Sequence, residues 1–241
     1  MIIGGLEKLT LLDYPDHLAA IIFTQGCNFR CHFCYNPLLV LPLKGGDVKN
    51  KKEKGFSPLS HKNLFLFLTE RFGRLEGVVI TGGEPTLHPD LPSFIKKIKD
   101  IGYLVKLDTN GTNPEMLVGL ISDKLIDYIA MDIKAPLSRY EEVVGVPVDC
   151  QNIEKSVNMI ISCGLPYEFR TTVVPGLLAA HDFAEMGKMI KGAKKWYLQN
   201  FKSDTGLVDN GFEKKPGYTA KEMDKFADIG KQYADLCEVR E

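Results

Sequence analysis

The sequence predicts an α/β fold in which helices lie outside a parallel sheet. Six short apolar segments rich in β-branched and aromatic residues alternate with six amphipathic segments. In the amphipathic segments Leu, Phe, Ile and Met recur every three or four residues, which is the helical period. Strands that alternate with helices form a parallel sheet with right-handed crossovers. Six units are too few to close an eight-stranded barrel, so we predict a partial (β/α)6 TIM-like open barrel; a flat doubly wound sheet is the alternative.

The elements follow the apolar pattern in chain order. The predicted strands span residues 18–24, 77–81, 103–109, 127–134, 167–174 and 195–201. The predicted helices span residues 61–72, 91–102, 114–124, 152–164, 182–193 and 219–236. Ser57-Pro58 and Asn113-Pro114 are typical of loops and helix starts, and they precede the first and third helices. We assign residues 1–241 to a single domain.

Two long polar connections interrupt this alternation. Residues 43–58 are rich in Lys and Gly, and residues 202–218 are mostly polar. Long loops on a compact barrel either cover a site or are slack connections. We expect both loops to be flexible, with the lysines of the first forming a solvated surface run.

Composition restricts the class of protein. A net charge of −1 gives no reason to expect nucleic acid or a membrane surface as a partner. No apolar run reaches the roughly 18 residues that a membrane span needs, and the first residues lack the layout of a signal peptide. We therefore expect a cytoplasmic protein, in which thiols stay reduced and clustered cysteines indicate metal or redox chemistry.

Three of the six cysteines lie within eight residues. Cys27, Cys31 and Cys34 form a C-x3-C-x2-C pattern in the segment FTQGCNFRCHFCYNP. Thiolates select zinc, copper(I) or iron–sulfur clusters. A structural zinc site needs a fourth ligand, and His32 is adjacent to Cys31 and cannot easily turn inward with it. Three thiolates on a [4Fe–4S] cluster leave one iron open for a substrate, which fits the triplet better than zinc or three reduced core thiols.

The remaining cysteines are far from the triplet in sequence. They lie in or beside predicted helices, where a free cysteine serves as a small apolar filler: Cys150, Cys163 and Cys237.

Polar residues follow several predicted strands. In either architecture ligands gather at the carboxyl ends of the strands. The residues at these ends are Cys27, Gly82-Gly83-Glu84, Asp108-Thr109-Asn110, Asp132 and Lys134. The plainer interpretations are a tight turn with a surface glutamate, an Asx-turn and a buried Asp–Lys pair.

The motifs together resemble a known family. With Phe33 before the last cysteine, the triplet resembles the signature of radical S-adenosylmethionine enzymes. TGGEP, DTNG, MDIK and RTTVVPG extend the resemblance over nearly the whole chain to the branch that activates glycyl-radical enzymes. Within it the chain most resembles the anaerobic ribonucleoside-triphosphate reductase activating proteins, which are related to the pyruvate formate-lyase activating enzymes.

This resemblance implies a defined chemistry. The open iron of a [4Fe–4S] cluster chelates S-adenosylmethionine, and one electron cleaves it to a 5′-deoxyadenosyl radical. The radical removes a hydrogen atom from a backbone glycine of a partner enzyme. Residues 35–81 contain no cysteine, so we expect no inserted ferredoxin-like domain and an external donor such as a flavodoxin or ferredoxin.

The resemblance also implies roles for single residues. Gly82, Gly83 and Glu84 bind the methionyl amino group. Asp108, Thr109 and Asp132 face the methionyl carboxylate through a monovalent cation, since carboxylates otherwise repel one another. Lys134 lies two residues after Asp132 on the same strand face, and from this position it could pair with that carboxylate directly. The other residues placed near the cofactor are Phe33, Arg170 and Gln199; Gln199 stands where the pyruvate formate-lyase relatives carry histidine.

Two alternatives remain open. A radical S-adenosylmethionine enzyme could act on a small molecule rather than on a partner protein. A non-catalytic iron–sulfur carrier or zinc-binding module is the alternative from a different class, and the missing fourth cysteine argues against the carrier.

Overall fold

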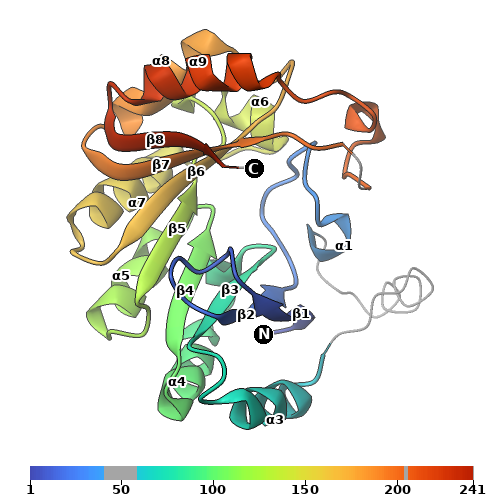
Figure 1. Ribbon diagram of the computed structural model, residues 1–241, viewed down its shortest axis with the longest axis vertical. Coiled ribbons are helices and arrows are strands. Elements are labelled where there is room, and N and C mark those ends of the chain that lie inside the picture. Colours follow the sequence, from blue (N-terminus) through green and yellow to red (C-terminus); the bar gives the residue numbers. More distant parts are fainter. Residues whose placement is uncertain (41–58, 204–205, 241) are drawn as a thin grey trace. The chain divides into compact units, whose positions relative to one another are not determined.

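A computed structural model of the protein describes residues 1–40, 59–203 and 206–240. These residues form an eight-stranded sheet whose strands follow one another in chain order (Figure 1). The strands are β1 (Ile3–Thr10), β2 (Ala19–Thr24), β3 (Gly77–Gly82), β4 (Leu104–Thr109), β5 (Tyr128–Asp132), β6 (Tyr167–Val173), β7 (Ala193–Asn200) and β8 (Ala234–Arg240). Within the described residues β1 and β8 end the sheet and do not pair with each other, so the predicted open α/β barrel is confirmed.

The six predicted helices occur in the predicted order, and two short helices at 37–40 and 140–144 were not predicted. They are α1 (Pro37–Val40), α3 (His61–Arg71), α4 (Leu91–Ile101), α5 (Pro114–Ser122), α6 (Tyr140–Val144), α7 (Cys150–Ser162), α8 (Ala180–Met189) and α9 (Ala220–Gly230). The described residues also include the short 3-10 helices η1 (Pro85–Leu87), η2 (Leu137–Arg139) and η3 (Asn210–Phe212). Pro114 opens α5 as predicted, whereas Ser57-Pro58 lies outside the described residues.

Two strands were not predicted. β1 pairs antiparallel with β2, and β8 pairs in parallel with β7. The predicted helix over 219–236 is wrong beyond Gly230, where the chain turns and enters β8. The buried positions Phe226, Gly230, Ala234 and Cys237 continue a spacing of three and four residues. Periodicity therefore could not separate the strand from the end of the helix.

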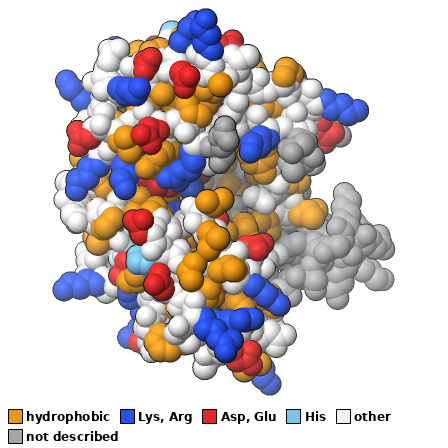
Figure 2. Space-filling model, viewed as in Figure 1, with side chains coloured by type: hydrophobic (Ala, Val, Ile, Leu, Met, Phe, Trp, Pro, Cys, Tyr) orange, Lys and Arg blue, Asp and Glu red, His pale blue; other side chains and the backbone are white. Residues whose placement is uncertain are grey.

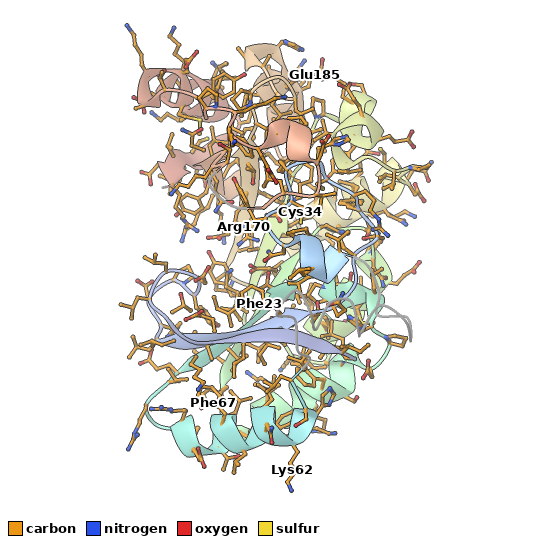
Figure 3. The ribbon with its side chains drawn as sticks, turned by 90° about the vertical axis from the view of Figure 1, so that its right-hand side faces the viewer. Phe23, Cys34, Lys62, Phe67, Arg170 and Glu185 are labelled. Carbon is orange, nitrogen blue, oxygen red and sulfur yellow. The ribbon has the colours of Figure 1, made fainter. Side chains whose placement is uncertain are left out.

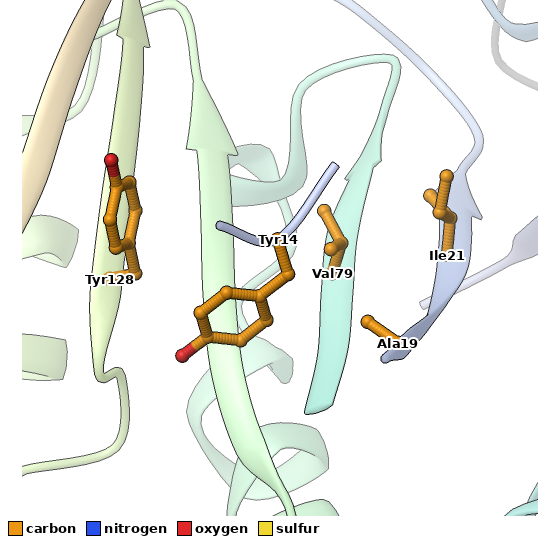
Figure 4. Close-up of a cluster of buried hydrophobic side chains, with 5 residues drawn as sticks. All are labelled: Tyr14, Ala19, Ile21, Val79 and Tyr128. Carbon is orange, nitrogen blue, oxygen red and sulfur yellow. The ribbon is translucent and has the colours of Figure 1, made fainter. Parts of the chain in front are cut away.

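The chain divides into two compact units. The first comprises residues 1–28, 38–109 and 115–129. Part of its core is formed by Tyr14, Ala19, Ile21, Val79 and Tyr128 (Figure 4). The rings of Tyr14 and Tyr128 meet edge to face with centroids 6.0 Å apart. The connection between β1 and β2 is therefore anchored by burial of Tyr14.

The second unit comprises residues 29–37, 110–114 and 130–241. Trp196 is fully buried, and its indole N–H donates to the Thr171 hydroxyl at 3.0 Å. The rings of Phe183 on α8 and Phe226 on α9 stack with centroids 4.6 Å apart, which packs both helices together. β6, β7 and β8 are parallel neighbours beneath them.

The surface carries charges of both signs. Lys and Arg are interspersed with Asp and Glu on the face shown in Figure 2, in keeping with a net charge of −1. Among the described residues, no helix combines the length and the apolar character needed to cross a membrane. The predicted loop at 43–58 lies outside the described residues, and the loop at 202–218 is described except for 204–205.

Candidate active site

The first cysteine is held by backbone hydrogen bonds within the first unit. After β2 the chain passes through Gly26 at a φ of 99°, where glycine carries little strain. The Gly26 amide donates to the Leu39 carbonyl at 2.7 Å, and the Cys27 amide donates to the Val40 carbonyl at 2.9 Å. These bonds fix the backbone from which the half-buried Cys27 side chain projects.

The glycine pair after β3 lies against this same backbone. The Glu84 amide donates to the Gly26 carbonyl at 2.8 Å. A Cβ placed on Gly83 would lie 1.9 Å from that carbonyl oxygen, so only glycine fits. Gly82 has a φ of 114°, and a Cβ placed on it would lie 2.4 Å from the Thr24 amide nitrogen. Within the first unit, these two glycines therefore let the turn after β3 pack closely against the backbone that precedes Cys27.

Glu84 is buried rather than on the surface, with 1% of its area exposed. Its Oε1 accepts hydrogen bonds from the Thr86 amide at 3.0 Å and the Thr86 hydroxyl at 2.6 Å. The Thr109 hydroxyl, at the end of β4, donates to the same oxygen at 2.8 Å. Glu84 and Thr109, predicted separately, are therefore brought into direct contact.

Asp108 has a partner that the sequence analysis did not single out. Lys106 lies two residues earlier on β4, and its Nζ is 2.5 Å from Asp108 Oδ1. The Lys106 side chain is 1% exposed and that of Asp108 is 10% exposed. The available signal was a lysine inside the apolar strand LVKLDT, at a spacing of two that places both side chains on one face.

Cys31 and Cys34 belong to the second unit. The Cys34 amide donates to the Cys31 carbonyl at 3.1 Å, forming a turn between the two thiols. The Arg30 amide donates to the Val144 carbonyl at 2.8 Å, which fastens this turn to the end of α6. Burial raises the pKa of the Cys31 thiol to about 11, while nearby Lys134 acts in the opposite direction. Cys34 is half-buried. Figure 3 shows its position and that of Arg170, which belongs to the same unit.

Asp132, Lys134 and Arg170 form an ionic cluster in the second unit. Asp132 Oδ1 is 3.0 Å from Arg170 Nε, and Asp132 Oδ2 is 3.0 Å from Lys134 Nζ. Burial by itself would raise the pKa of Asp132, but Arg170 and Lys134 outweigh it and lower that pKa to about 2. The cluster contains two cations and one carboxylate, so it carries a net positive charge. The plainer interpretation of Asp132 and Lys134, a buried ion pair, therefore also describes this geometry, and Arg170 is an additional member of the cluster.

Two further predicted residues lie in the second unit. Phe33 is buried, and Lys134 Nζ lies 6.0 Å from its ring centroid. This distance is at the limit of a cation–π interaction. Gln199 is half-buried on β7, in register with Thr172 of β6 and Arg240 of β8.

The 202–218 connection contacts the cysteine segment within the second unit. His32 lies 3.2 Å from Asp209 and stacks on Phe212 with centroids 5.8 Å apart. The Lys202 amide donates to the Tyr35 hydroxyl at 2.8 Å. The described part of this connection therefore fastens the residues that flank Cys31 and Cys34. Sequence reasoning treated His32 only as a candidate ligand and missed this role.

The predicted site residues are thus distributed over both units. The first unit holds Cys27, Gly82, Gly83, Glu84, Asp108 and Thr109, and the second holds Cys31, Phe33, Cys34, Asp132, Lys134, Arg170 and Gln199. Over residues 1–40, 59–203 and 206–240, no three or more His, Cys, Asp or Glu side chains are grouped to hold a metal ion. The structure describes the surroundings of each thiol, and the three-thiolate ligand set remains a prediction.

The other three cysteines have separate surroundings. Cys150 begins α7 and Cys163 follows it, and their thiols donate to the Leu137 and Ile160 carbonyls. Cys237 is buried on β8, not beside a helix end as predicted.

The chemistry of the donor set fits an iron–sulfur cluster. None of the three cysteines of the triplet forms a disulfide, and the Lys134 ammonium near Cys31 acts against the burial that raises the pKa of its thiol. The buried carboxylate of Glu84 and the cations Lys134 and Arg170 are groups that complement an ammonium and a carboxylate, respectively.

Comparison with known proteins agrees with this chemistry. The chain belongs to the radical SAM superfamily, whose family model matches residues 21–189. It is therefore an enzyme, and membership of this family implies a [4Fe–4S] cluster and S-adenosylmethionine as cofactors. A relative from Methanocaldococcus jannaschii, named "Putative glycyl-radical enzyme activating enzyme", is 33% identical over 99% of this chain and 95% of its own length. A second protein of the same name and organism is 28% identical over 82% of this chain and 70% of its own length.

Other similarities are more partial. A "Probable GTP 3',8-cyclase" from Sulfolobus acidocaldarius is 33% identical over 56% of this chain and 40% of its own length. Among solved structures, Streptococcus suis SuiB bound to S-adenosylmethionine has a TM-score of 0.64 at 16% identity, over 92% of this chain and 50% of that chain. A domain of pyruvate-formate lyase-activating enzyme from Bacteroides vulgatus has a TM-score of 0.55 at 16% identity, over 69% of this chain and 99% of that chain. The structural similarities support the fold alone.

Proposed function

We propose that this protein activates a glycyl-radical enzyme, and that its partner is an anaerobic ribonucleoside-triphosphate reductase. The observation that carries the proposal is the relative of 33% identity, since the similarity extends over nearly the full length of both chains. When bound, the cluster and S-adenosylmethionine supply a one-electron cleavage that yields a 5′-deoxyadenosyl radical. The partner supplies a backbone glycine as hydrogen donor.

The chain's own residues have two tasks in this proposal. Cys27, Cys31 and Cys34 hold the cluster as thiolates, and the fastened backbones at Gly26 and Arg30 restrict where these thiolates point. Restricting the ligands in advance lowers the entropy lost when the cluster binds.

The second task is to orient the methionyl end of the cofactor. Glu84, held by Thr86 and Thr109, accepts from the amino group. Lys134 and Arg170 attract the methionyl carboxylate. The low pKa of Asp132 keeps its own carboxylate, which contacts both cations, charged at neutral pH. Phe33 and Gln199 are proposed to lie beside the cofactor. The electron comes from a separate flavodoxin or ferredoxin, because no cysteines beyond the triplet are proposed as cluster ligands.

A small-molecule substrate is the second candidate function. The similarity to GTP 3',8-cyclases over half of this chain favours it, because those proteins are named for a reaction on a nucleotide. The match covers only 40% of the length of the Sulfolobus acidocaldarius cyclase but 95% of the length of the first Methanocaldococcus jannaschii relative, so the latter carries more weight.

The proposed function is tested by adding the partner to the reduced, reconstituted enzyme with S-adenosylmethionine. We expect slow formation of 5′-deoxyadenosine by the enzyme alone and faster formation with the reductase, measured by liquid chromatography. The reductase should acquire a stable carbon-centred radical signal in electron paramagnetic resonance. If GTP, and not the reductase, accelerates 5′-deoxyadenosine formation, the small-molecule function is correct.

A further inference from the structure

Lys106 is an unusual residue for the middle of an apolar strand. It lies on β4 between Val105 and Leu107, both fully buried, and its own side chain is 1% exposed. Lysine is almost never fully buried unless its charge is paired, because moving an ammonium group out of water is costly. A specific partner must therefore offset this cost.

That partner is Asp108, on the same face of the same strand. Lys106 Nζ lies 2.5 Å from Asp108 Oδ1, and it also lies 5.8 Å from the ring centroid of Tyr128. The pair is neutral as a whole. Its two charges are joined through a covalent link of two residues, so no translational entropy is lost when the ammonium approaches the carboxylate.

Asp108 is also the residue for which the family resemblance implied a free monovalent cation. A cation there would keep the Asp108 carboxylate from repelling the methionyl carboxylate of the cofactor. We propose that the Lys106 ammonium serves as this counter-ion, so that S-adenosylmethionine binds to this protein without a free monovalent cation. The inference rests on the proposed cofactor site and adds a residue to it.

Asp132 is the second aspartate that the family resemblance places at the monovalent cation, and it too is paired with cationic side chains. Asp132 in the second unit is paired with Lys134 and Arg170, each at 3.0 Å. Each of the two aspartates therefore has at least one cationic side chain of its own. A further free cation would have to share the Asp108 carboxylate with Lys106 in one unit. In the other unit it would be repelled by the net positive charge around Asp132.

The test compares potassium chloride with tetramethylammonium chloride at equal ionic strength, which keeps charge screening the same. Tetramethylammonium has no N–H donor and is too large to enter a potassium site. The proteins are the wild type, Lys106→Met and Lys99→Met. Met keeps the length of the Lys106 side chain and removes its charge. Lys99 is the matched control, because it is paired with Asp127 in the same unit at 2.6 Å but lies outside the proposed cofactor site.

Two quantities are measured. The first is the dissociation constant of S-adenosylmethionine from the reconstituted protein, by equilibrium dialysis. We expect the two salts to give values within about twofold for the wild type and Lys99→Met. For Lys106→Met we expect binding about tenfold or more tighter in potassium. The second quantity is the melting temperature of the protein without cluster. Potassium should raise it only in Lys106→Met, since the ion then takes the place of the Lys106 ammonium beside Asp108 in the folded state.

A wild type whose S-adenosylmethionine affinity falls tenfold without potassium would overturn the inference, as would a Lys106→Met protein indifferent to potassium in both measurements. If Lys106→Met does not fold, the wild-type comparison still decides. The double variant Lys106→Met/Asp108→Asn, which removes both charges, should then fold and melt at the same temperature in both salts. A protein that holds its cluster but binds no S-adenosylmethionine in either salt refutes the proposed function instead, while the melting temperatures still test Lys106.

Discussion

Replacement of any one of Cys27, Cys31 and Cys34 by Ala is expected to abolish both cluster assembly and cleavage of S-adenosylmethionine. Each change leaves only two thiolates of the proposed set, and no other described cysteine lies in the same backbone segments. Reconstituted wild-type protein should bind about four irons and absorb broadly in the visible range. The iron content of each variant and the amount of 5′-deoxyadenosine formed are the two measurements.

The other three cysteines provide matched controls. Cys150→Ala and Cys163→Ala should keep the full iron content, because these thiols lie at the two ends of α7 and donate to the Leu137 and Ile160 carbonyls. Cys237→Ala should also keep its iron, but it should melt at a lower temperature because its side chain is buried against Gly230 on α9. Loss of iron from a folded variant of these three residues would refute the ligand assignment.

Gly83→Ala is expected to destabilise the protein by at least about 3 kcal/mol. The added Cβ would lie 1.9 Å from the Gly26 carbonyl oxygen, and both clashing groups belong to hydrogen-bonded backbone. Relief requires the backbone that precedes Cys27 to move. A folded fraction of this variant should therefore also reconstitute less iron. Thermal or denaturant unfolding followed by circular dichroism gives the change in the free energy of unfolding.

Gly119→Ala is the control for this substitution in the same unit. Gly119 is exposed on α5, and a Cβ there would meet no atom within 4 Å. Ala in an exposed helical position should raise stability by up to about 1 kcal/mol. Equal stability of the Gly83→Ala and Gly119→Ala proteins would show that the Gly83–Gly26 contact is not tight in solution.

Much of the fold could be predicted because its strands and helices differ in length and period. The six central strands are short, apolar and separated by amphipathic helices, and the structure places them within a few residues of the prediction. β1 was not predicted because IGGLEKLT mixes two glycines with charged residues. It also lies at an edge of the sheet, where β2 is its only neighbouring strand among the described residues. β8 was not predicted because its buried residues continue the three- and four-residue spacing of the buried residues of α9.

The candidate site could be predicted where residue type and spacing carry chemistry. The cysteine triplet and the residues at strand ends were found in this way, and the structure joins Glu84 to Thr109 and Asp132 to Arg170. Lys106 was missed because site residues were expected at the ends of strands, whereas this lysine lies within one. The contacts of His32 with Asp209 and Phe212 join residues far apart in sequence, so no local pattern could indicate them.

The most direct test of the proposed function is to follow hydrogen transfer from the partner. The reductase is prepared with its glycines deuterated at Cα and is incubated with the reduced enzyme and S-adenosylmethionine. If this protein generates a glycyl radical, mass spectrometry should show one deuterium in the 5′-deoxyadenosine, and the doublet splitting of the radical signal should collapse. Formation of 5′-deoxyadenosine that contains no deuterium, with no radical on the reductase, would contradict the account.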